Sequence, residues 1–315
     1  MTRSFLRDDD LTPAEQAEVL ALATELKDEP YDHKPLAGPR TVAMVFDKPT
    51  LRTQASFAAG IAELGGHPML VDGALAGIGK RESVADVARV LGRQASQIVW
   101  RTYAQSNLEE MAAFSGVPVI NALTDEFHPC QLLADLLTIQ EHKGTLAGIT
   151  VAFLGDAACN MGNSWALAGV TAGMHVRFGC PEGYAPDADV LERAGALGAV
   201  GTGSTGGTVH VFDDPVAAVG GVDVVVTDTW VSMGKEDEAA ARRDVFGTYA
   251  VTADLLAEAR DDAIVMHCLP AYRGSEIAAE VIDGPHSVVW DEAENRRHAQ
   301  KAVMSWLQAQ SSSRA

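Results

Sequence analysis

The stretch that decides the fold of this 315-residue chain is Val45-Phe46-Asp47-Lys48-Pro49-Thr50-Leu51-Arg52-Thr53-Gln54-Ala55-Ser56-Phe57. Val45 and Phe46 are the last residues of an apolar run that begins at Thr41. A short apolar run that ends at a turn signal predicts a buried strand. Phe57, Ile61 and Leu64 then follow at helical spacing. The pattern therefore predicts a strand, a turn at Pro49 and a helix.

Thr50 to Thr53 lie where the predicted loop becomes a helix. A helix N-terminus presents backbone N–H groups and a partial positive charge, so it suits a phosphate. Two hydroxyls and one guanidinium add side-chain donors and a fixed cation. This segment alone fits a phosphate site and an ordinary helix start with an incidental arginine equally well, so downstream residues must decide.

Length and composition indicate the number of domains and exclude some classes of partner. A chain of this length predicts two domains, and 47% hydrophobic residues give each a core. The 43 acidic and 24 basic residues give a net charge of −19, which argues against nucleic acid or an anionic membrane as a partner. An anionic small substrate would then need a local cluster of Arg and His.

The four cysteines show neither metal-ligand spacing nor a disulfide framework: Cys130, Cys159, Cys180 and Cys268. A reducing cytoplasm fits them best, and we expect no metal site. The polar N-terminus is unlike a signal peptide, and no apolar run reaches the length of a membrane span. We therefore predict a cytoplasmic protein.

Strand and helix patterns alternate along the whole chain. A boundary is expected near residue 145, and parallel α/β sheets are expected on both sides of it. The expected strands cover 41–46, 69–71, 97–102, 117–121, 150–154, 175–178, 222–227 and 263–266, and the expected helices include 83–91, 130–142, 163–172 and 292–308. The glycine-rich segment 195–207 is predicted to be a surface loop or a weak strand.

Polar side chains follow several of the predicted strands. In parallel sheets ligands bind outside the carboxyl ends of strands, so this placement indicates an enzyme. The residues are Arg101, Asn160, Asp228, His267 and Cys268. Blander interpretations remain open for each, such as a salt bridge for Arg101 or a buried inert thiol for Cys268. The segment after Gly155 lacks the glycine fingerprint of dinucleotide binding.

The set and order of the motifs resemble the transcarbamylase family, and within it the branch with an ornithine-type acceptor. The resemblance extends from Phe5 to Trp306. It rests on Phe46 to Phe57, Trp100-Arg101-Thr102, His128-Pro129-Cys130-Gln131, Asp228 to Gly234 with its Ser-Met-Gly, His267-Cys268-Leu269-Pro270 and Glu294-Asn295-Arg296.

The resemblance implies two doubly wound parallel-sheet domains of similar size. Residues 1–145, with a returning C-terminal helix at about 292–309, would bind carbamoyl phosphate. Residues 146–291 would bind the amino acid. The family forms homotrimers with active sites between subunits and needs no metal or organic cofactor. The implied reaction moves the carbamoyl group to the side-chain amine of L-ornithine.

The resemblance also implies roles for individual residues. Carbamoyl phosphate would be held by Thr50, Leu51, Arg52, Thr53, Arg101, His128, Gln131, Cys268, Leu269 and Arg296. Of these, Arg52, Arg101, His128 and Cys268 are the catalytic candidates, with Arg101, His128 and Thr53 polarising the carbonyl oxygen. The acceptor would be held by Asn160, Asp228, Ser232 and Met233.

The chain departs from the family pattern in three places. The usual Ser-Thr-Arg-Thr-Arg is here Thr50-Leu51-Arg52-Thr53-Gln54, a polar loop residue is replaced by Gly77, and Ser-Arg-Tyr is replaced by Gly92-Arg93-Gln94. Three hypotheses follow. The chain is an ornithine-using enzyme with a relaxed donor site, a specialised carbamoyltransferase for another amine such as a diaminopropionate-like one, or a catalytically weak homologue with a binding role.

Overall fold

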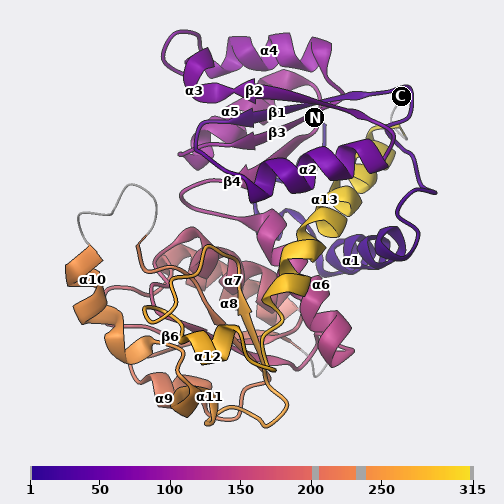
Figure 1. The fold of residues 1–315 in the computed structure, drawn as a ribbon. Coiled ribbons are helices and arrows are strands. Elements are labelled where there is room, and N and C mark those ends of the chain that lie inside the picture. Colours follow the sequence, from indigo (N-terminus) through magenta and orange to yellow (C-terminus); the bar gives the residue numbers. More distant parts are fainter. Residues whose placement is uncertain (1, 201–205, 232–238, 313–315) are drawn as a thin grey trace. The chain divides into compact units, whose positions relative to one another are not determined.

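Parallel strands and crossover helices alternate through the computed structural model, which describes residues 2–200, 206–231 and 239–312 (Figure 1). The chain forms two compact units, the first made of Met1–Ala134 and Glu294–Ala315 and the second of Asp135–Ala293. Every pairing between the named strands is parallel. The predicted α/β class with two parallel-sheet domains is therefore confirmed.

The sheet of the first unit has the strand order β2-β1-β3-β4. Its strands are β1 (Thr41–Phe46), β2 (His67–Asp72), β3 (Gln97–Arg101) and β4 (Val119–Leu123). The chain starts at β1, adds β2 on one side and then crosses to add β3 and β4 on the other. The direction of winding thus reverses between β1 and β3.

The helices of the first unit connect and cover these strands. They are α1 (Pro13–Asp28), α2 (Arg52–Glu63), α3 (Gly73–Ala76), α4 (Val84–Gln94) and α5 (Gln105–Ser115), with a 3-10 turn η1 (Asp8–Asp10) before them. Helix α1 begins with the capping box expected from Thr12 and Glu15, because each side chain accepts the other's backbone N–H. Helices α6 (Pro129–Lys143) and α13 (Val289–Ser312) begin in one unit and end in the other.

The sheet of the second unit has the order β7-β6-β5-β8-β9. Its strands are β5 (Thr150–Leu154), β6 (His175–Gly179), β7 (Thr208–Phe212), β8 (Val224–Thr227) and β9 (Ile264–His267). Here the winding reverses between β5 and β8. The connecting elements are α7 (Asn160–Thr171), α8 (Ala188–Val200), α9 (Pro215–Val219), α10 (Ala239–Phe246), η3 (Gly247–Tyr249), α11 (Ala253–Leu256) and α12 (Ala279–Ile282).

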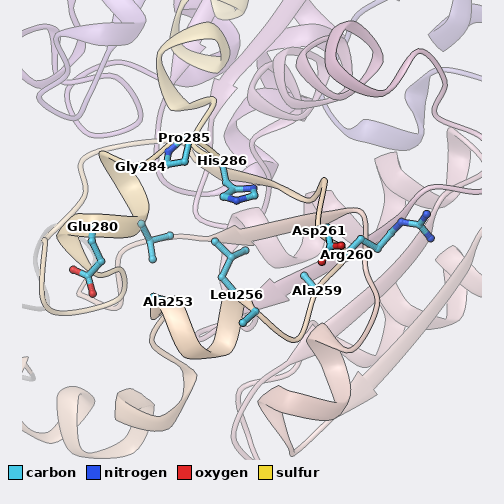
Figure 2. Close-up of a pocket in the computed structure, with 11 residues that line it drawn as sticks. Ala253, Leu256, Ala259, Arg260, Asp261, Glu280, Gly284, Pro285 and His286 are labelled. Atoms are coloured by element: carbon cyan, nitrogen blue, oxygen red, sulfur yellow. The ribbon is translucent and has the colours of Figure 1, made fainter.

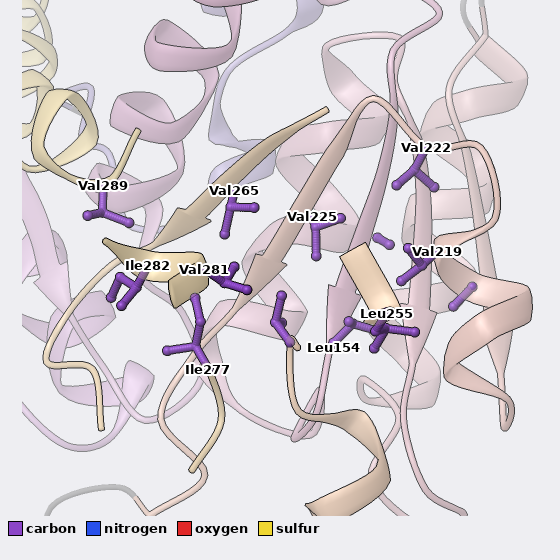
Figure 3. Close-up of a cluster of buried hydrophobic side chains, with 13 residues drawn as sticks. Leu154, Val219, Val222, Val225, Leu255, Val265, Ile277, Val281, Ile282 and Val289 are labelled. Atoms are coloured by element: carbon purple, nitrogen blue, oxygen red, sulfur yellow. The ribbon is translucent and has the colours of Figure 1, made fainter. Parts of the chain in front are cut away.

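Each sheet packs against its covering helices through a core of buried apolar side chains. In the second unit, Leu154, Val225 and Val265 project from three strands against residues of α9, α11 and α12 (Figure 3). In the first unit, Ile98 and Trp100 of β3 pack with residues of α4 and α5. Among the described residues, no helix is both long and apolar enough to cross a membrane.

The structure corrects some local predictions. Residues 195–200 are helical, as the end of α8, so a loop or weak strand at this part of 195–207 was wrong. Glycine has a low helix propensity, but tertiary packing overrides it here, since Ala194 of the same helix is fully buried. The strand expected at 117–121 begins two residues later, at Val119, because a left-handed residue at Gly116 ends α5 just before it.

The first-unit core gives a stability prediction. Ile98→Ala removes a fully buried side chain of β3 and should lower the free energy of unfolding by about 2–5 kcal/mol. Val90→Ala on the same unit truncates a side chain that is 54% exposed and should change it by less than about 0.5 kcal/mol. Urea unfolding followed by circular dichroism measures both, and equal effects would contradict this account of the core.

Candidate functional site

The two points where winding reverses are where ligands bind in doubly wound sheets. In the first unit, this point lies between the carboxyl ends of β1 and β3, which lead into the Thr50–Thr53 loop and end at Arg101. In the second unit, it lies between β5 and β8, which lead to Asn160 and Asp228. The topology therefore places the sequence-predicted residues at both positions.

The hydroxyl of Thr53 is the centre of the first-unit group. Thr53 is buried in the first turn of α2, and its Oγ1 accepts from Nη2 of Arg296 at 3.0 Å and from Nη1 of Arg101 at 3.4 Å. Arg296 also donates through Nη1 to Oε1 of Gln131, which is fully buried. Four predicted residues, drawn from α2, β3, α6 and α13, are thus brought together.

His128 lies in the field of these arginines. Its side chain is buried, and burial lowers its pKa well below the usual value, with further lowering by Arg296, Arg101 and Arg52. The imidazole is therefore neutral near pH 7 and can donate one hydrogen bond without adding charge. The lowering of this pKa by the three arginines reports a positive potential at this point, which favours an anionic ligand although the chain as a whole is acidic.

Asp47 is a bracing residue whose role the sequence did not reveal. Its carboxylate accepts from the indole Nε1 of Trp100 at 2.9 Å, and its backbone N–H donates to the carbonyl of Arg101 at 2.9 Å. These bonds tie the loop after β1 to the end of β3. Burial raises the pKa of this carboxyl group. Lys48 pairs with Asp125 and lies 4.5 Å from the ring centroid of Tyr103.

Helix α13 carries Arg296 and is anchored by a buried lysine. Lys301 is fully buried, and its Nζ donates to the carbonyls of Leu26 at 3.0 Å and Pro30 at 3.1 Å and to Glu63 at 2.7 Å. The ammonium group has three protons and finds three acceptors, so its burial is compensated. The bond to Glu63 joins α13 to the end of α2, the helix that supplies Thr53 at its start.

Asp228 and Cys268 meet in the second unit. The Cys268 thiol donates to Oδ1 of Asp228 at 3.3 Å, and the backbone N–H of Thr229 donates to the same oxygen at 2.7 Å. Burial, reinforced by Asp228, raises the pKa of the Cys268 thiol well above its usual value. Cys268 is therefore a protonated hydrogen-bond donor in this arrangement and not a thiolate nucleophile.

One group of side chains in the described part of the chain has donor atoms suited to a metal. Atoms of Asp228, His267 and Cys268 lie within 4.8 Å of one another. However, the two ring nitrogens of His267 contact the N–H of Leu269 and the carboxylate of Glu276, and the thiol is protonated. These residues therefore form a hydrogen-bonded arrangement that fits a metal poorly.

Arg242 is a second brace that sequence patterns did not indicate. It is buried on α10, and its Nη1 donates to Oδ2 of Asp156 at 2.6 Å and to the carbonyl of Trp230 at 2.9 Å. The two partners follow β5 and β8, the strands that flank the second switch point. An arginine within a polar helical segment has no sequence signature that separates it from a solvated one.

The remaining predicted residues are placed as follows. Thr50 is half-buried and Arg52 is the first residue of α2, while Leu51 precedes it with 80% of its surface exposed. Asn160 opens α7, and Leu269 follows Cys268 with a left-handed φ of 60°. Ser232 and Met233 lie outside the described residues.

A groove of about 380 Å³ lies elsewhere in the second unit (Figure 2). It is lined by α11, α12 and residues that flank the amino end of β9, such as Arg260 and His286. Arg260 is paired with Asp223 at 3.2 Å, and His286 contacts the carbonyl of Ala263 at 2.8 Å. This groove contains none of the predicted site residues.

Two family models match the chain. The carbamoyl-P binding domain of aspartate/ornithine carbamoyltransferase matches residues 3–141, and its Asp/Orn binding domain matches residues 147–307. The chain belongs to the aspartate/ornithine carbamoyltransferase family.

Relatives within this family cover the whole chain. The ornithine carbamoyltransferase of Clavibacter sepedonicus is 62% identical over 99% of this chain and 100% of its own. The ornithine carbamoyltransferase of Renibacterium salmoninarum is 60% identical over 98% of this chain and 99% of its own length. The crystal structure of the ornithine carbamoyltransferase from Gloeobacter violaceus is 42% identical in sequence, with a TM-score of 0.87, and the match covers 98% of this chain and 99% of that one. The structure of the ornithine carbamoyltransferase from Pyrococcus furiosus is 43% identical, with a TM-score of 0.91, and the match covers 96% of each chain.

Two of the departures from the family pattern have local structural reasons. Gly77 ends α3 in the left-handed region with a φ of 66°, where glycine is the favoured residue. Gly92 lies where α4 meets α5, and a Cβ there would stand 1.8 Å from the carbonyl oxygen of Ser115. A side chain at Gly77 would thus strain this backbone, and one at Gly92 would clash with it.

The third departure lies on the loop itself. Leu51 precedes α2, and its carbonyl accepts the first intrahelical bond, from Ala55 at 2.9 Å. Gln54 is half-buried and lines a groove of about 350 Å³ between the loop and β2. A helix N-terminus directs the amides of its first turn outward whatever its side chains are, so this source of anion binding is retained.

The buried histidine of α13 gives a pH prediction. Burial and the nearby cations Arg297, Lys301 and Lys27 lower the pKa of His298 to about 4. An unfolded histidine titrates near about 6.5, so between about pH 6.5 and 4 the unfolded chain binds a proton that the native chain does not. This contribution to stability is present above that window and is lost as the pH falls through it. We expect His298→Gln to lose less unfolding free energy between pH 7 and pH 5 than the unmodified protein.

Urea titrations at the two pH values test this expectation. His67→Gln, which changes an exposed histidine of the same unit, is the control and should keep the unmodified pH dependence. An unaltered pH dependence in His298→Gln would contradict the assignment.

Proposed function

We propose that this protein transfers the carbamoyl group of carbamoyl phosphate to the side-chain amine of L-ornithine, giving citrulline and phosphate. The observation that supports this most directly is the group of side chains at the switch point of the first sheet. There Arg101 and Arg296 donate to the Thr53 hydroxyl, and both lie near the neutral His128. Relatives of 62% and 60% identity are named ornithine carbamoyltransferase, which supports ornithine as the acceptor.

The phosphate of the donor would lie at the start of α2. The amides of Leu51, Arg52 and Thr53, with the side chains of Thr50, Arg52 and Thr53, supply donors and one cation there. Arg101 and Arg296 add two guanidinium groups that contact the Thr53 hydroxyl. Phosphate is the leaving group, so stabilising its charge also lowers the barrier to its departure.

The carbonyl oxygen of the donor would face Arg101, His128 and Thr53. In the reaction the neutral amine attacks the carbonyl carbon, a C–N bond forms, the C–O bond to phosphate breaks and the amine loses a proton. Negative charge develops on the carbonyl oxygen, and donors already held in place stabilise it. Gln131 and the backbone of Cys268 and Leu269 would hold the carbamoyl amide.

The acceptor would bind at the switch point of the second sheet. Its α-amino and α-carboxylate groups would be held by Asn160, Asp228, Ser232 and Met233, with Asp228 as the counter-ion of the α-ammonium. Cys268, which donates to Asp228, would lie beside the attacking amine. Most of the rate gain would come from positioning two bound substrates.

The wider setting of the enzyme is also part of the proposal. Like the family it belongs to, the protein would form a homotrimer with active sites between subunits, work in the cytoplasm without metal or organic cofactor, and serve arginine biosynthesis. The four unpaired cysteines fit a reducing compartment. Residues 1–145 with the helix at 292–309 would be the donor domain, and residues 146–291 the acceptor domain.

Acceptor choice gives the principal test. In steady-state assays with carbamoyl phosphate, ornithine should give the highest kcat/KM of a panel that also contains lysine, 2,4-diaminobutyrate and 2,3-diaminopropionate. Its value should lie within about 10⁴–10⁸ M⁻¹ s⁻¹. Strong activity on another amine with little on ornithine would favour a specialised carbamoyltransferase, and no turnover would favour a binding role.

The Thr53 hydroxyl gives a second test. Thr53→Val keeps the branched shape and removes the acceptor for both guanidinium groups, a loss of about 1.5–3 kcal/mol per hydrogen bond to a charged group. We expect kcat/KM for carbamoyl phosphate to fall at least about tenfold. Thr24→Val on α1, whose hydroxyl bonds only within its helix, is the matched control. A rate within twofold of the unmodified enzyme would refute the assigned role.

A further inference from the structure

A buried acid–histidine pair lies behind the Cys268 turn and has no assigned role. The side chains of His267 and Glu276 are 0% and 1% exposed, and Nε2 of His267 lies 3.3 Å from Oε1 of Glu276. His267 ends β9, whereas Glu276 lies in the irregular segment before α12. Charged side chains are rarely buried without a specific partner, so the burial of this pair indicates a specific structural role.

The hydrogen bonds define which ring nitrogen carries the proton. The backbone N–H of Leu269 donates to Nδ1 of His267 at 2.9 Å, so Nδ1 is an acceptor. A neutral imidazole then has its proton on Nε2, the atom that faces Glu276. Glu276 in turn accepts the backbone N–H of Tyr272 at 2.5 Å. Glu276 thus selects the tautomer that Leu269 requires.

The bond from Leu269 matters because its backbone is strained. Leu269 has a φ of 60°, in the left-handed region that residues with a side chain seldom adopt. Such a conformation persists only where the surroundings hold it. The same turn carries Cys268, whose thiol donates to Asp228 at 3.3 Å. Any loosening at Leu269 would therefore move the Cys268 thiol relative to Asp228.

We propose that Glu276 is a positioning residue that acts through His267 to hold the Cys268–Leu269 turn in its binding geometry. It touches no reacting atom. The chain of contacts runs from Glu276 to His267, from His267 to the Leu269 amide, and along the turn to Cys268. The inference about catalysis rests on the proposed function, since it assigns this turn to the bound acceptor and the carbamoyl amide. The inference about geometry does not.

Glu276→Leu is the decisive variant, because it keeps a side chain of similar size and removes the acceptor. Loss of that acceptor withdraws the bond that favours a proton on Nε2, and in the other tautomer Nδ1 and the Leu269 amide are both donors and repel. Nε2 of His267 and the backbone N–H of Tyr272 both face Oε1 of Glu276, so Glu276→Gln can keep its carbonyl oxygen at that point and should behave as the unmodified protein. Glu280→Leu is the matched control, because Glu280 is exposed on α12 in the same unit. Neither glutamate belongs to the proposed substrate contacts.

Thiol labelling tests the geometry without any need for turnover. Iodoacetamide is added to the full-length protein, and modification is followed at each cysteine by mass spectrometry. We expect Glu276→Leu to raise the labelling rate of Cys268 at least threefold and to leave Cys180, a buried cysteine of the same unit, unchanged. Equal rates at Cys268 in variant and unmodified protein overturn the proposal. A parallel rise at Cys180 also overturns it, since that reports general loosening of the unit.

A double variant tests whether the effect passes through His267. If it does, Glu276→Leu combined with His267→Gln should label at Cys268 no faster than His267→Gln alone. Additive effects would show that Glu276 acts by another route and would reject the proposal.

Kinetics then separate this inference from the proposed function. In Glu276→Leu, kcat/KM for the acceptor should fall at least tenfold, while the inhibition constant of inorganic phosphate against carbamoyl phosphate stays within twofold. Weakening of both by the same factor would indicate a general structural role and overturn the assignment. If the unmodified protein turns over no acceptor, the proposed function fails, and the labelling result still decides the role of Glu276.

Discussion

Parallel strands joined by crossover helices impose one constraint from which the rest of this structure follows. All loops after the strands emerge at the same edge of a sheet, and where the winding reverses, the two adjacent loops leave in opposite directions and make room for a ligand. This reversal falls between β1 and β3 in one unit and between β5 and β8 in the other. The candidate site residues follow these four strands and β9, so they are concentrated where the topology leaves space.

Electrostatics divides the two sites by charge. The chain has a net charge of −19, yet burial and three nearby arginines lower the pKa of His128 and keep it neutral at the first switch point. A local positive potential of this kind selects small anions without attracting polyanions to the whole surface. The second site is acidic, with Asp228 held by a thiol and a backbone amide, and this suits an amine. Carbamoyl transfer to ornithine brings together an anionic donor and an acceptor that carries an α-ammonium group and attacks through its neutral side-chain amine.

Buried polar networks hold the candidate site residues in place. Lys301 fixes α13 through three acceptors, Asp47 joins β1 to β3, and Arg242 links the segments after β5 and β8. Such networks add little net stability, because desolvation offsets most of the attraction. Their value lies in geometry, since a polar group with one satisfactory arrangement excludes the alternatives. The Glu276–His267 pair belongs to the same class.

The amino-acid pattern alone was enough to predict the fold class, the bounds of β1 and β5, the start of α2 and the residues at the strand ends, because periodicity, capping residues and glycine or proline breaks are local signals. It could not show that residues 195–200 are helical. Nor could it show that Gly77 has a left-handed backbone or that a Cβ at Gly92 would clash with Ser115. Nor could it find Asp47, Arg242, Lys301 or Glu276 as braces. Those roles depend on contacts such as Lys301 with Leu26, 275 residues apart in the chain. Only the tertiary structure decides them, because the partners of a buried charge are set by packing and not by neighbouring residues.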